Sequence, residues 1–267
     1  FLANPISSDL DVMRPNALIN LIAAVGRNQS RGFADLSLFE VGPEFFGDQP
    51  GDQRLVAAGL RAGATTPRSW TGSRRDVDLF DAKADAEALL EALGTAAANV
   101  QVNVDGAPQW YHPGRSAALQ LGPKNVLGYF GELHPKVLKA LGVKGRVMAF
   151  ELFIENVPSP KKKGTGRPAL NASSFQSVER DFAFLLDADV KSDAIVKAAR
   201  SVDRNLITDV TIFDLYAGKG IEDGKKSIAF SITLQPTKAT LTEEEIDAVS
   251  KKVVAAVEKA TGGSLRA

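Results

Sequence analysis

Residues 213–216 (FDLY), close to the C-terminus, combine side chains that could bind a nucleobase. Side chains alternate between the two faces of a β-strand, so if Phe213 and Leu215 face the core, Asp214 and Tyr216 share the opposite face. There the Asp214 carboxylate could accept hydrogen bonds from a base edge, and the Tyr216 ring could stack on a base. An exposed tyrosine on a half-solvated sheet would explain the same residues.

Two other groups of residues could do chemistry. Residues 110–115 (WYHPGR) suit either a substrate or interface loop or a packed turn. Asp78, Asp81 and Asp85 could hold a metal, but acidic residues in the first turns of a helix are also favoured by the helix dipole. Walker P-loop, G-x-S-x-G and H-E-x-x-H motifs do not occur in the sequence.

Composition restricts the classes of function. The 267 residues include 32 Lys+Arg, 32 Asp+Glu, two His and no Cys, so disulfides and Cys-ligated metal sites are excluded. Zero net charge gives no general attraction to nucleic acid or membrane. No apolar stretch is long enough to span a bilayer, and the opening residues do not have the pattern of a signal peptide, so the expected compartment is the cytoplasm. Because the first residue is Phe1, we expect a fragment or a processed product.

Proline, glycine and lysine divide the chain. The segment PSPKKKGTGRP, which begins at Pro158, suits an exposed linker. We therefore expect a domain over residues 1–157, a linker over 158–170 and a second domain over 171–267. The lysines at 161–163 fit a solvated charge run or a phosphate contact. The second domain has 13 basic and 15 acidic residues, so it is not a basic module.

The second domain has a readable order of elements. Strands are expected over residues 180–186, 210–216, 227–235 and 264–266, with one helix capped by Ser192 and another by a Thr242–Glu245 capping box. The order β-α-β-β-α-β predicts a ferredoxin-like domain. Both helices then cover one face of an antiparallel sheet. The other face is open and presents Ser227, Ala229, Ser231 and Thr233, which suits RNA bases or a partner protein.

The first domain is less regular. Pro15 is expected at the first position of a helix, and a second helix is expected over residues 78–93. Strands are expected over residues 36–46, 55–60, 100–104, 116–121, 126–133 and 147–157, with a short helix after Pro135. Closely spaced strands joined by tight turns indicate an antiparallel sheet with flanking helices, so the fold class is α+β.

Long segments in the right order resemble one family, the β subunit of bacterial phenylalanyl-tRNA synthetase. NPISSDLDVMRPNALINLIAAVGRNQSR, YHPGRSAALQLG and GYFGELHPKVLKALGV resemble its class II synthetase-like core. SVERDFAFLLD, IFDLYAGKGIEDGKKSIAFSITLQPTKATLTEEEI and GGSLR resemble its ferredoxin-fold anticodon-binding domain.

The resemblance implies that residues 1–157 form a degenerate, non-catalytic synthetase-like domain that packs against an α subunit. The α subunit would catalyse the ATP- and magnesium-dependent charging of phenylalanine tRNA within a heterotetramer, and this chain would itself hold no cofactor or metal. An active class II site needs an arginine in a G-x-G-x-x-R run. The nearest candidate here, Gly128 to Leu133, has none.

The resemblance also assigns anticodon contacts to Asp214, Tyr216, Ser227 and Arg266, and Arg180, Lys225 and Lys226 are candidate phosphate contacts. Gln176, Ala217 and Ala239 depart from the family pattern, the last two where a basic residue is common, so this domain alone should bind RNA weakly. The alternative is a non-enzymatic interaction module whose ferredoxin-like domain binds a small molecule or a protein. That alternative predicts no preference among tRNAs.

Overall fold

The computed structural model describes residues 1–8, 11–159 and 172–266. The chain divides into two compact units, Phe1–Thr165 and Gly166–Ala267. We call them unit 1 and unit 2, and each is described by itself. Most of the predicted linker, with the lysines at 161–163, lies outside the described residues. Within the described residues, no helix is long and apolar enough to cross a membrane.

Unit 1 is built on a six-stranded antiparallel sheet in the order β1-β2-β6-β5-β4-β3. Its strands are β1 (Leu36–Phe45), β2 (Gln53–Ala62), β3 (Gln101–Asn103), β4 (Tyr111–Leu121), β5 (Asn125–Leu133) and β6 (Val147–Phe153). Its helices are α1 (Leu18–Gln29), α2 (Leu79–Ala92) and α3 (Pro135–Ala140), with 3₁₀ turns at Ala97–Asn99 and Ile154–Asn156.

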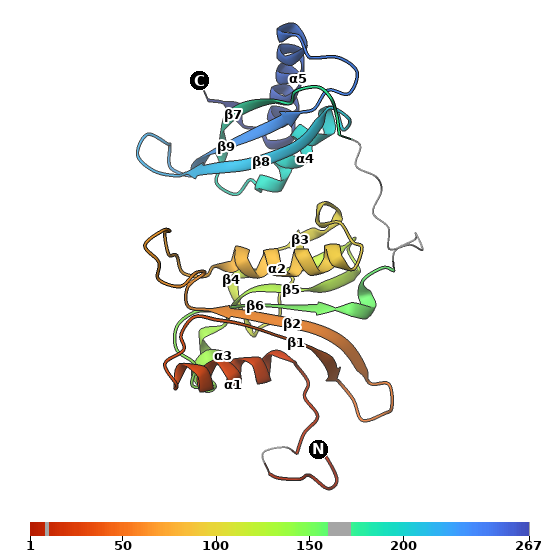
Figure 1. The fold of residues 1–267 in the computed structure, drawn as a ribbon, viewed down its shortest axis with the longest axis vertical. Coiled ribbons are helices and arrows are strands. Elements are labelled where there is room, and N and C mark those ends of the chain that lie inside the picture. Colours follow the sequence, from red (N-terminus) through yellow and green to blue (C-terminus); the bar gives the residue numbers. More distant parts are fainter. Residues whose placement is uncertain (9–10, 160–171, 267) are drawn as a thin grey trace. The chain divides into compact units, whose positions relative to one another are not determined.

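Helices cover both faces of this sheet (Figure 1). Leu18, Ile22 and Val25 of α1 pack with alternate residues of β2 and β6 in one core cluster, which also holds Leu138 of α3. Ala86 and Leu90 of α2 pack in a second cluster on the opposite face. Strands that are covered on both sides are rich in buried apolar residues, and β6 is buried along its whole length.

One pairing joins the two halves of the sheet. The β1–β2 hairpin and the β3–β6 meander each form from strands near in sequence, whereas β2 and β6 are distant in sequence and pair from Val56↔Phe153 to Ala62↔Val147. Gly59 lies opposite Phe150 in this β2–β6 seam, and a Cβ on Gly59 would lie 2.4 Å from the phenyl ring. The ring can therefore lie over β2 only because residue 59 is a glycine.

Three predictions for unit 1 need correction. The first helix begins at Leu18 rather than at Pro15, because the Asn16 side chain accepts a hydrogen bond from the Leu18 amide at 2.7 Å and so prepares the first turn. The predicted loop at 110–115 is mostly the start of β4, which pairs Tyr111 with Leu133. The last predicted strand stops at Phe153 and continues as a 3₁₀ turn.

Unit 2 has the expected β-α-β-β-α-β order. It contains β7 (Val178–Asp187), α4 (Ser192–Val202), β8 (Ile207–Tyr216), β9 (Lys225–Leu234), α5 (Glu243–Thr261) and β10 (Ser264–Leu265). The antiparallel sheet has the order β10-β7-β9-β8. Ile228, Phe230, Ile232 and Leu234 of β9 are fully buried with apolar residues of α4 and α5. Both helices thus cover one face and leave the other open (Figure 1).

Local signals fixed the helix ends of unit 2 with one exception. Thr242 and Glu245 form the predicted capping box, and Gly262 ends α5 in the left-handed conformation with φ of 69°. Ser192 is not a cap. It is the first residue of α4, Lys191 occupies the cap position, and this described helix has no side-chain cap. Ala260 at the end of α5 is exposed rather than part of the buried stripe.

Candidate functional site

Strand register brings the predicted base-binding residues onto the open face of unit 2. Tyr216 of β8 pairs with Ser227 of β9, and Asp214 pairs with Ala229. Cross-strand partners in an antiparallel sheet point to the same face, and Ser227 alternates with the buried residues of β9. Arg266 follows β10 at the other edge, and its Nη1 lies 3.4 Å from Ser227 Oγ. The side chains of Asp214, Tyr216, Ser227 and Arg266 therefore belong to one surface.

A β-bulge in β8 produces this arrangement. Ile212 pairs with buried Phe230, but the next pair along the ladder is Asp214 with Ala229, so Phe213 is an extra residue. Without the bulge, strict alternation from Ile212 would put Asp214 and Tyr216 on the helix-covered face. The expected position of Leu215 agrees with the register, because Leu215 pairs with buried Ile228 of the helix-covered face, although its side chain is exposed. Phe213 was expected in the core but is exposed, as the extra residue of the bulge.

Tyr216 is positioned by the turn that follows it. Tyr216 is 42% exposed, and its hydroxyl donates a hydrogen bond to the Lys219 carbonyl at 3.0 Å. A Cβ on Gly218 would lie 2.9 Å from that hydroxyl, so a larger residue at 218 would require the Tyr216 side chain to shift. This hydrogen bond was not predicted from the sequence, although the glycines after Tyr216 indicate a tight turn.

Ser227 and Arg266 are held in different ways. Ser227 is only 5% exposed although it lies on the open face, because it stands in the middle of the sheet between Tyr216 and Leu185. The Arg266 backbone amide donates to the Ala183 carbonyl at 2.7 Å, which extends the β10–β7 pairing to the residue before the chain end. Its guanidinium therefore lies beside the serine hydroxyl.

The three candidate phosphate contacts do not lie together. Lys225 alternates with Ser227 and belongs to the open face, where it forms an ion pair with Glu222 at 2.9 Å. Arg180 pairs with buried Ile232 on the other face and forms an ion pair with Glu243 at 3.2 Å. Lys226 Nζ donates to the carbonyls of Ala188 and Val190 at 2.8 and 2.6 Å, and so holds the turn before α4.

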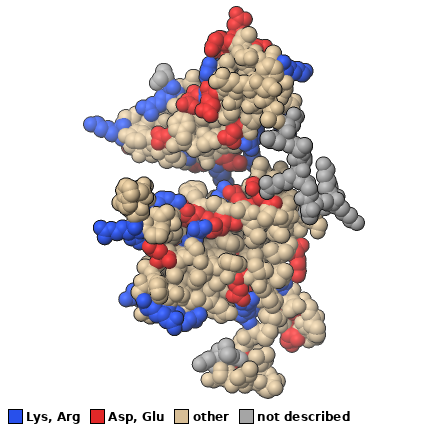
Figure 2. Space-filling model, in the orientation of Figure 1, with Lys and Arg blue, Asp and Glu red and all other residues tan. Residues whose placement is uncertain are grey.

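Carboxylates share the open face with the predicted base-binding residues. Glu179, Asp181 and Asp209 belong to the open face by their pairing with Thr233 and Ser231. Figure 2 shows basic and acidic side chains interspersed on the side of unit 2 that it presents. A surface of this kind repels phosphate along part of its length, so the face is better suited to contacting bases than to following an RNA backbone.

Unit 1 shows neither a phosphate loop nor a metal cluster among its described residues. Gly128 and Gly131 lie within β5 and pair with Leu152 and Ala149, so they are part of the sheet rather than of a loop. Asp78 caps α2 and Asp81 completes its capping box. Asp85 forms a two-bonded ion pair with Arg61 at 2.6 and 2.7 Å. No group of three or more possible ligands is placed to hold a metal within the described chain.

The residues at 110–111 have a structural partner that the sequence did not suggest. Trp110 Nε1 and the Tyr111 hydroxyl donate to the Glu151 carboxylate at 3.0 and 3.1 Å, and Asn16 Nδ2 donates to it as well. Burial raises the pKa of Glu151 to about 7, and the nearby Glu44 carboxylate adds to the rise, although the three hydrogen bonds lower it. The network ties the start of α1 to the middle of the sheet.

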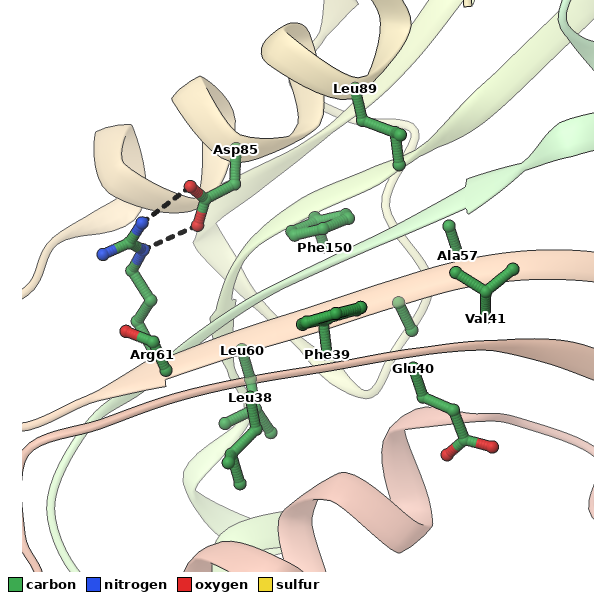
Figure 3. A pocket seen from close by; sticks show the side chains of 12 residues that line it. Leu38, Phe39, Glu40, Val41, Ala57, Leu60, Arg61, Asp85, Leu89 and Phe150 are labelled. Carbon is green, nitrogen blue, oxygen red and sulfur yellow. Dashed lines mark hydrogen bonds and ion pairs between the residues drawn. The ribbon is translucent and has the colours of Figure 1, made fainter. Parts of the chain in front are cut away.

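An apolar depression lies between α2 and β1, on the face of the sheet that α2 covers. It has a volume of about 340 Å³, and Figure 3 shows Phe39, Val41 and Phe150 lining it, with the Arg61–Asp85 ion pair at its rim. Phe39 is 80% exposed. Large exposed apolar patches commonly mark protein–protein interfaces.

Comparison with known families agrees with both units. Residues 1–154 match the phenylalanyl tRNA synthetase beta chain CLM domain, and residues 173–266 match the ferredoxin-fold anticodon binding domain. Together the two units define a region of an aminoacyl-tRNA synthetase that includes an anticodon-binding domain. The chain belongs to the family of bacterial phenylalanyl-tRNA synthetase beta subunits and corresponds to their C-terminal region.

The relatives cover the whole chain. It is 58% identical to the phenylalanine–tRNA ligase beta subunit of Rhodospirillum rubrum over 99% of its length, and 54% identical to that of Bradyrhizobium diazoefficiens over 100%. It spans about a third of the length of these relatives. A pyrrolysyl tRNA synthetase from Desulfitobacterium hafniense aligns over 58% of this chain and 51% of its own, with 12% identity and a TM-score of 0.42. That similarity is too low to support a conclusion.

Proposed function

We propose that unit 2 binds the anticodon of phenylalanine tRNA on its open face and that unit 1 is a non-catalytic scaffold for an α subunit. The whole ligase, a cytoplasmic heterotetramer, would use ATP and magnesium on α. The observation that supports the proposal best is the convergence of Tyr216, Asp214, Ser227 and Arg266 on one face through the β8–β9 register and the Arg266–Ser227 contact. Family membership removes the reason for a non-synthetase module.

Each side chain has a separate role in this proposal. The Tyr216 ring stacks on the first anticodon base, since a stacking platform accepts the face of the base and leaves its edge free. Asp214 and Ser227 hydrogen-bond that edge, and Arg266 supplies a cation beside them. The proposed domain limits remain 1–157, 158–170 and 171–267.

The experiment that tests this function is Tyr216→Ala in the full-length protein assembled with its α subunit. Loss of a stacking ring typically costs about 1–3 kcal/mol per base, so tRNA affinity should fall roughly 5- to 150-fold. Phenylalanine-dependent pyrophosphate exchange should stay unchanged, because the proposal places that reaction on α.

Two control variants sharpen the test. Tyr216→Phe keeps the ring and loses only the bond to Lys219, so affinity should change by no more than a few-fold. Leu215→Ala removes a neighbouring exposed side chain that lies on the other face of the sheet, and it should leave affinity unchanged. Unchanged affinity in Tyr216→Ala, or unfolding of the domain, would favour a purely structural tyrosine.

Unit 1 should carry no adenylation activity. Its glycine pair is built into β5, and the G-x-G-x-x-R arginine is missing from that run. Purified chain without α should give no phenylalanine-dependent exchange of pyrophosphate into ATP. Exchange above the level of a heat-denatured sample would refute the scaffold role.

A further inference from the structure

Phe213 is a large aromatic side chain that the fold of unit 2 does not use. The bulge inserts it between Ile212 and Asp214, so the β8–β9 ladder gives it no partner residue. It is 57% exposed, and β8 is an edge strand of the sheet. The core of unit 2 is complete without it, since Ile212 and Val210 supply the apolar side chains of this part of β8.

The position of Phe213 relates it to the proposed anticodon site. At a bulge two residues oppose one, and here the extra residue Phe213 directly precedes Asp214, which pairs with Ala229 of the open face. Phe213 precedes Tyr216 by three residues, which corresponds to about 10 Å along a strand. Asp214, the proposed base-edge acceptor, lies between the two aromatic side chains.

This spacing determines what RNA conformation could use both rings. Bases that stack on each other along one strand are only about 3.4 Å apart, so consecutive stacked bases could not reach both aromatics. Unstacked bases of a single-stranded loop can be splayed apart, and proteins commonly bind them on aromatic side chains. A strand that runs along β8 could therefore place one base on Tyr216 and its neighbour on Phe213.

We propose that Phe213 is a second stacking platform, which binds the anticodon nucleotide next to the one on Tyr216. The inference rests on the proposed anticodon-binding function and adds a second nucleotide to it. An RNA base fits this position better than an apolar peptide, because Thr211 and Asp214, which pair with Ser231 and Ala229 of the open face, bring polar side chains that can contact base edges to this part of β8.

The test combines protein variants with abasic tRNAs in the full-length protein assembled with its α subunit. Phe213→Ala, Phe213→Leu and Phe213→Trp are compared with Tyr216→Ala and with the control Leu215→Ala, another exposed apolar residue of β8. Binding is measured with phenylalanine tRNA carrying an abasic nucleotide at each anticodon position in turn. These pairs form double-mutant cycles that assign a nucleotide to each ring.

The expected result is a roughly 5- to 150-fold loss of affinity for Phe213→Ala and Phe213→Leu, with Phe213→Trp close to wild type. The loss should disappear only when the abasic site is at the position adjoining the one coupled to Tyr216. Wild-type affinity in Phe213→Leu would overturn the inference. So would a double-mutant cycle in which Phe213 is coupled to the same nucleotide as Tyr216, or to no nucleotide. If Tyr216→Ala also has no effect, it is the proposed anticodon site itself that fails.

Discussion

Glu151 is a buried carboxylate whose hydrogen-bond partners are all donors. The contacting nitrogens of Trp110 and Asn16 can only donate hydrogen bonds. Of the three partners, only the Tyr111 hydroxyl could rotate and accept a hydrogen bond from a protonated Glu151. The hydrogen bonds therefore favour the ionised form, whereas burial opposes it and dominates the pKa. The contribution of Glu151 to the free energy of unfolding should therefore depend on pH.

The sign of the pH effect follows from proton linkage. The folded pKa of about 7 is above the ordinary value of 4.5, so between these values the folded state binds more protons than the unfolded state. The contribution of Glu151 to the free energy of unfolding should fall as pH rises from about 4.5 to 7. The full change is on the order of 3 kcal/mol.

Glu151→Gln tests this. Wild type and variant should be compared by chemical denaturation at pH 5, 6, 7 and 8. The variant should be less stable at pH 5, because its amide NH₂ would face the donors Trp110 or Asn16. The difference should shrink toward pH 8, where wild type bears a buried charge. A difference that is constant with pH would exclude titration of Glu151 in this range.

At the scale of elements, both ends of α5 were predicted correctly. The Thr242–Glu245 box and Gly262 are local signals, because each acts through hydrogen bonds or backbone angles within a few residues. Periodicity likewise located the buried residues of β9. The predicted cap at Ser192 was wrong. Serine is a common N-cap residue, but here Lys191 is at the cap position and Ser192 is already the first residue of α4.

The bulge in β8 could not be predicted from alternation. Residues 210–216 (VTIFDLY) fit two inward sets, one with Val210 and Ile212 and the other with Phe213 and Leu215. Only the pairing with β9 shows that Val210 and Ile212 face inward and that the extra residue at the bulge then reverses the faces of the residues that follow. The Glu151 network was hidden for a similar reason, because its members come from three distant segments.

The Thr242 cap permits a prediction about α5. Thr242→Ala removes the hydroxyl that accepts from the Glu245 amide at 3.3 Å, and such losses typically cost about 1 kcal/mol. Amide hydrogen exchange in the first turns of α5 should become roughly 5-fold faster. Thr240→Ala, an exposed threonine just before the helix, is the matched control and should exchange like wild type. Equal rates in both variants would mean that the cap does not limit opening of the helix.

At the scale of the whole molecule, the apolar depression of unit 1 is the surface that most needs a partner. Phe39 and Val41 are exposed beside it on β1. We propose that this surface takes part in the α interface, so the purified chain alone should self-associate. Sedimentation velocity should show association that added α subunit relieves.

Charge substitutions locate that surface. Phe39→Lys with Val41→Lys should reduce both self-association and binding of α, because a lysine in the depression would have to be desolvated. Trp70→Lys changes an even more exposed side chain, 96% accessible, that does not line the depression, and should behave like wild type. A monomeric wild-type chain without affinity for α would contradict the scaffold role of unit 1.

The β2–β6 seam has a consequence for how fast unit 1 can acquire its sheet. The β1–β2 hairpin and the β3–β6 meander can each form from neighbouring segments, whereas the seam requires closure of a long loop before any of its contacts form. Until then β2 and β6 have open edges that another chain could pair with. Because Phe150 must settle over Gly59 to close the seam, a side chain at residue 59 would prolong this interval. We therefore expect unit 1 to be most prone to aggregation before this seam has closed.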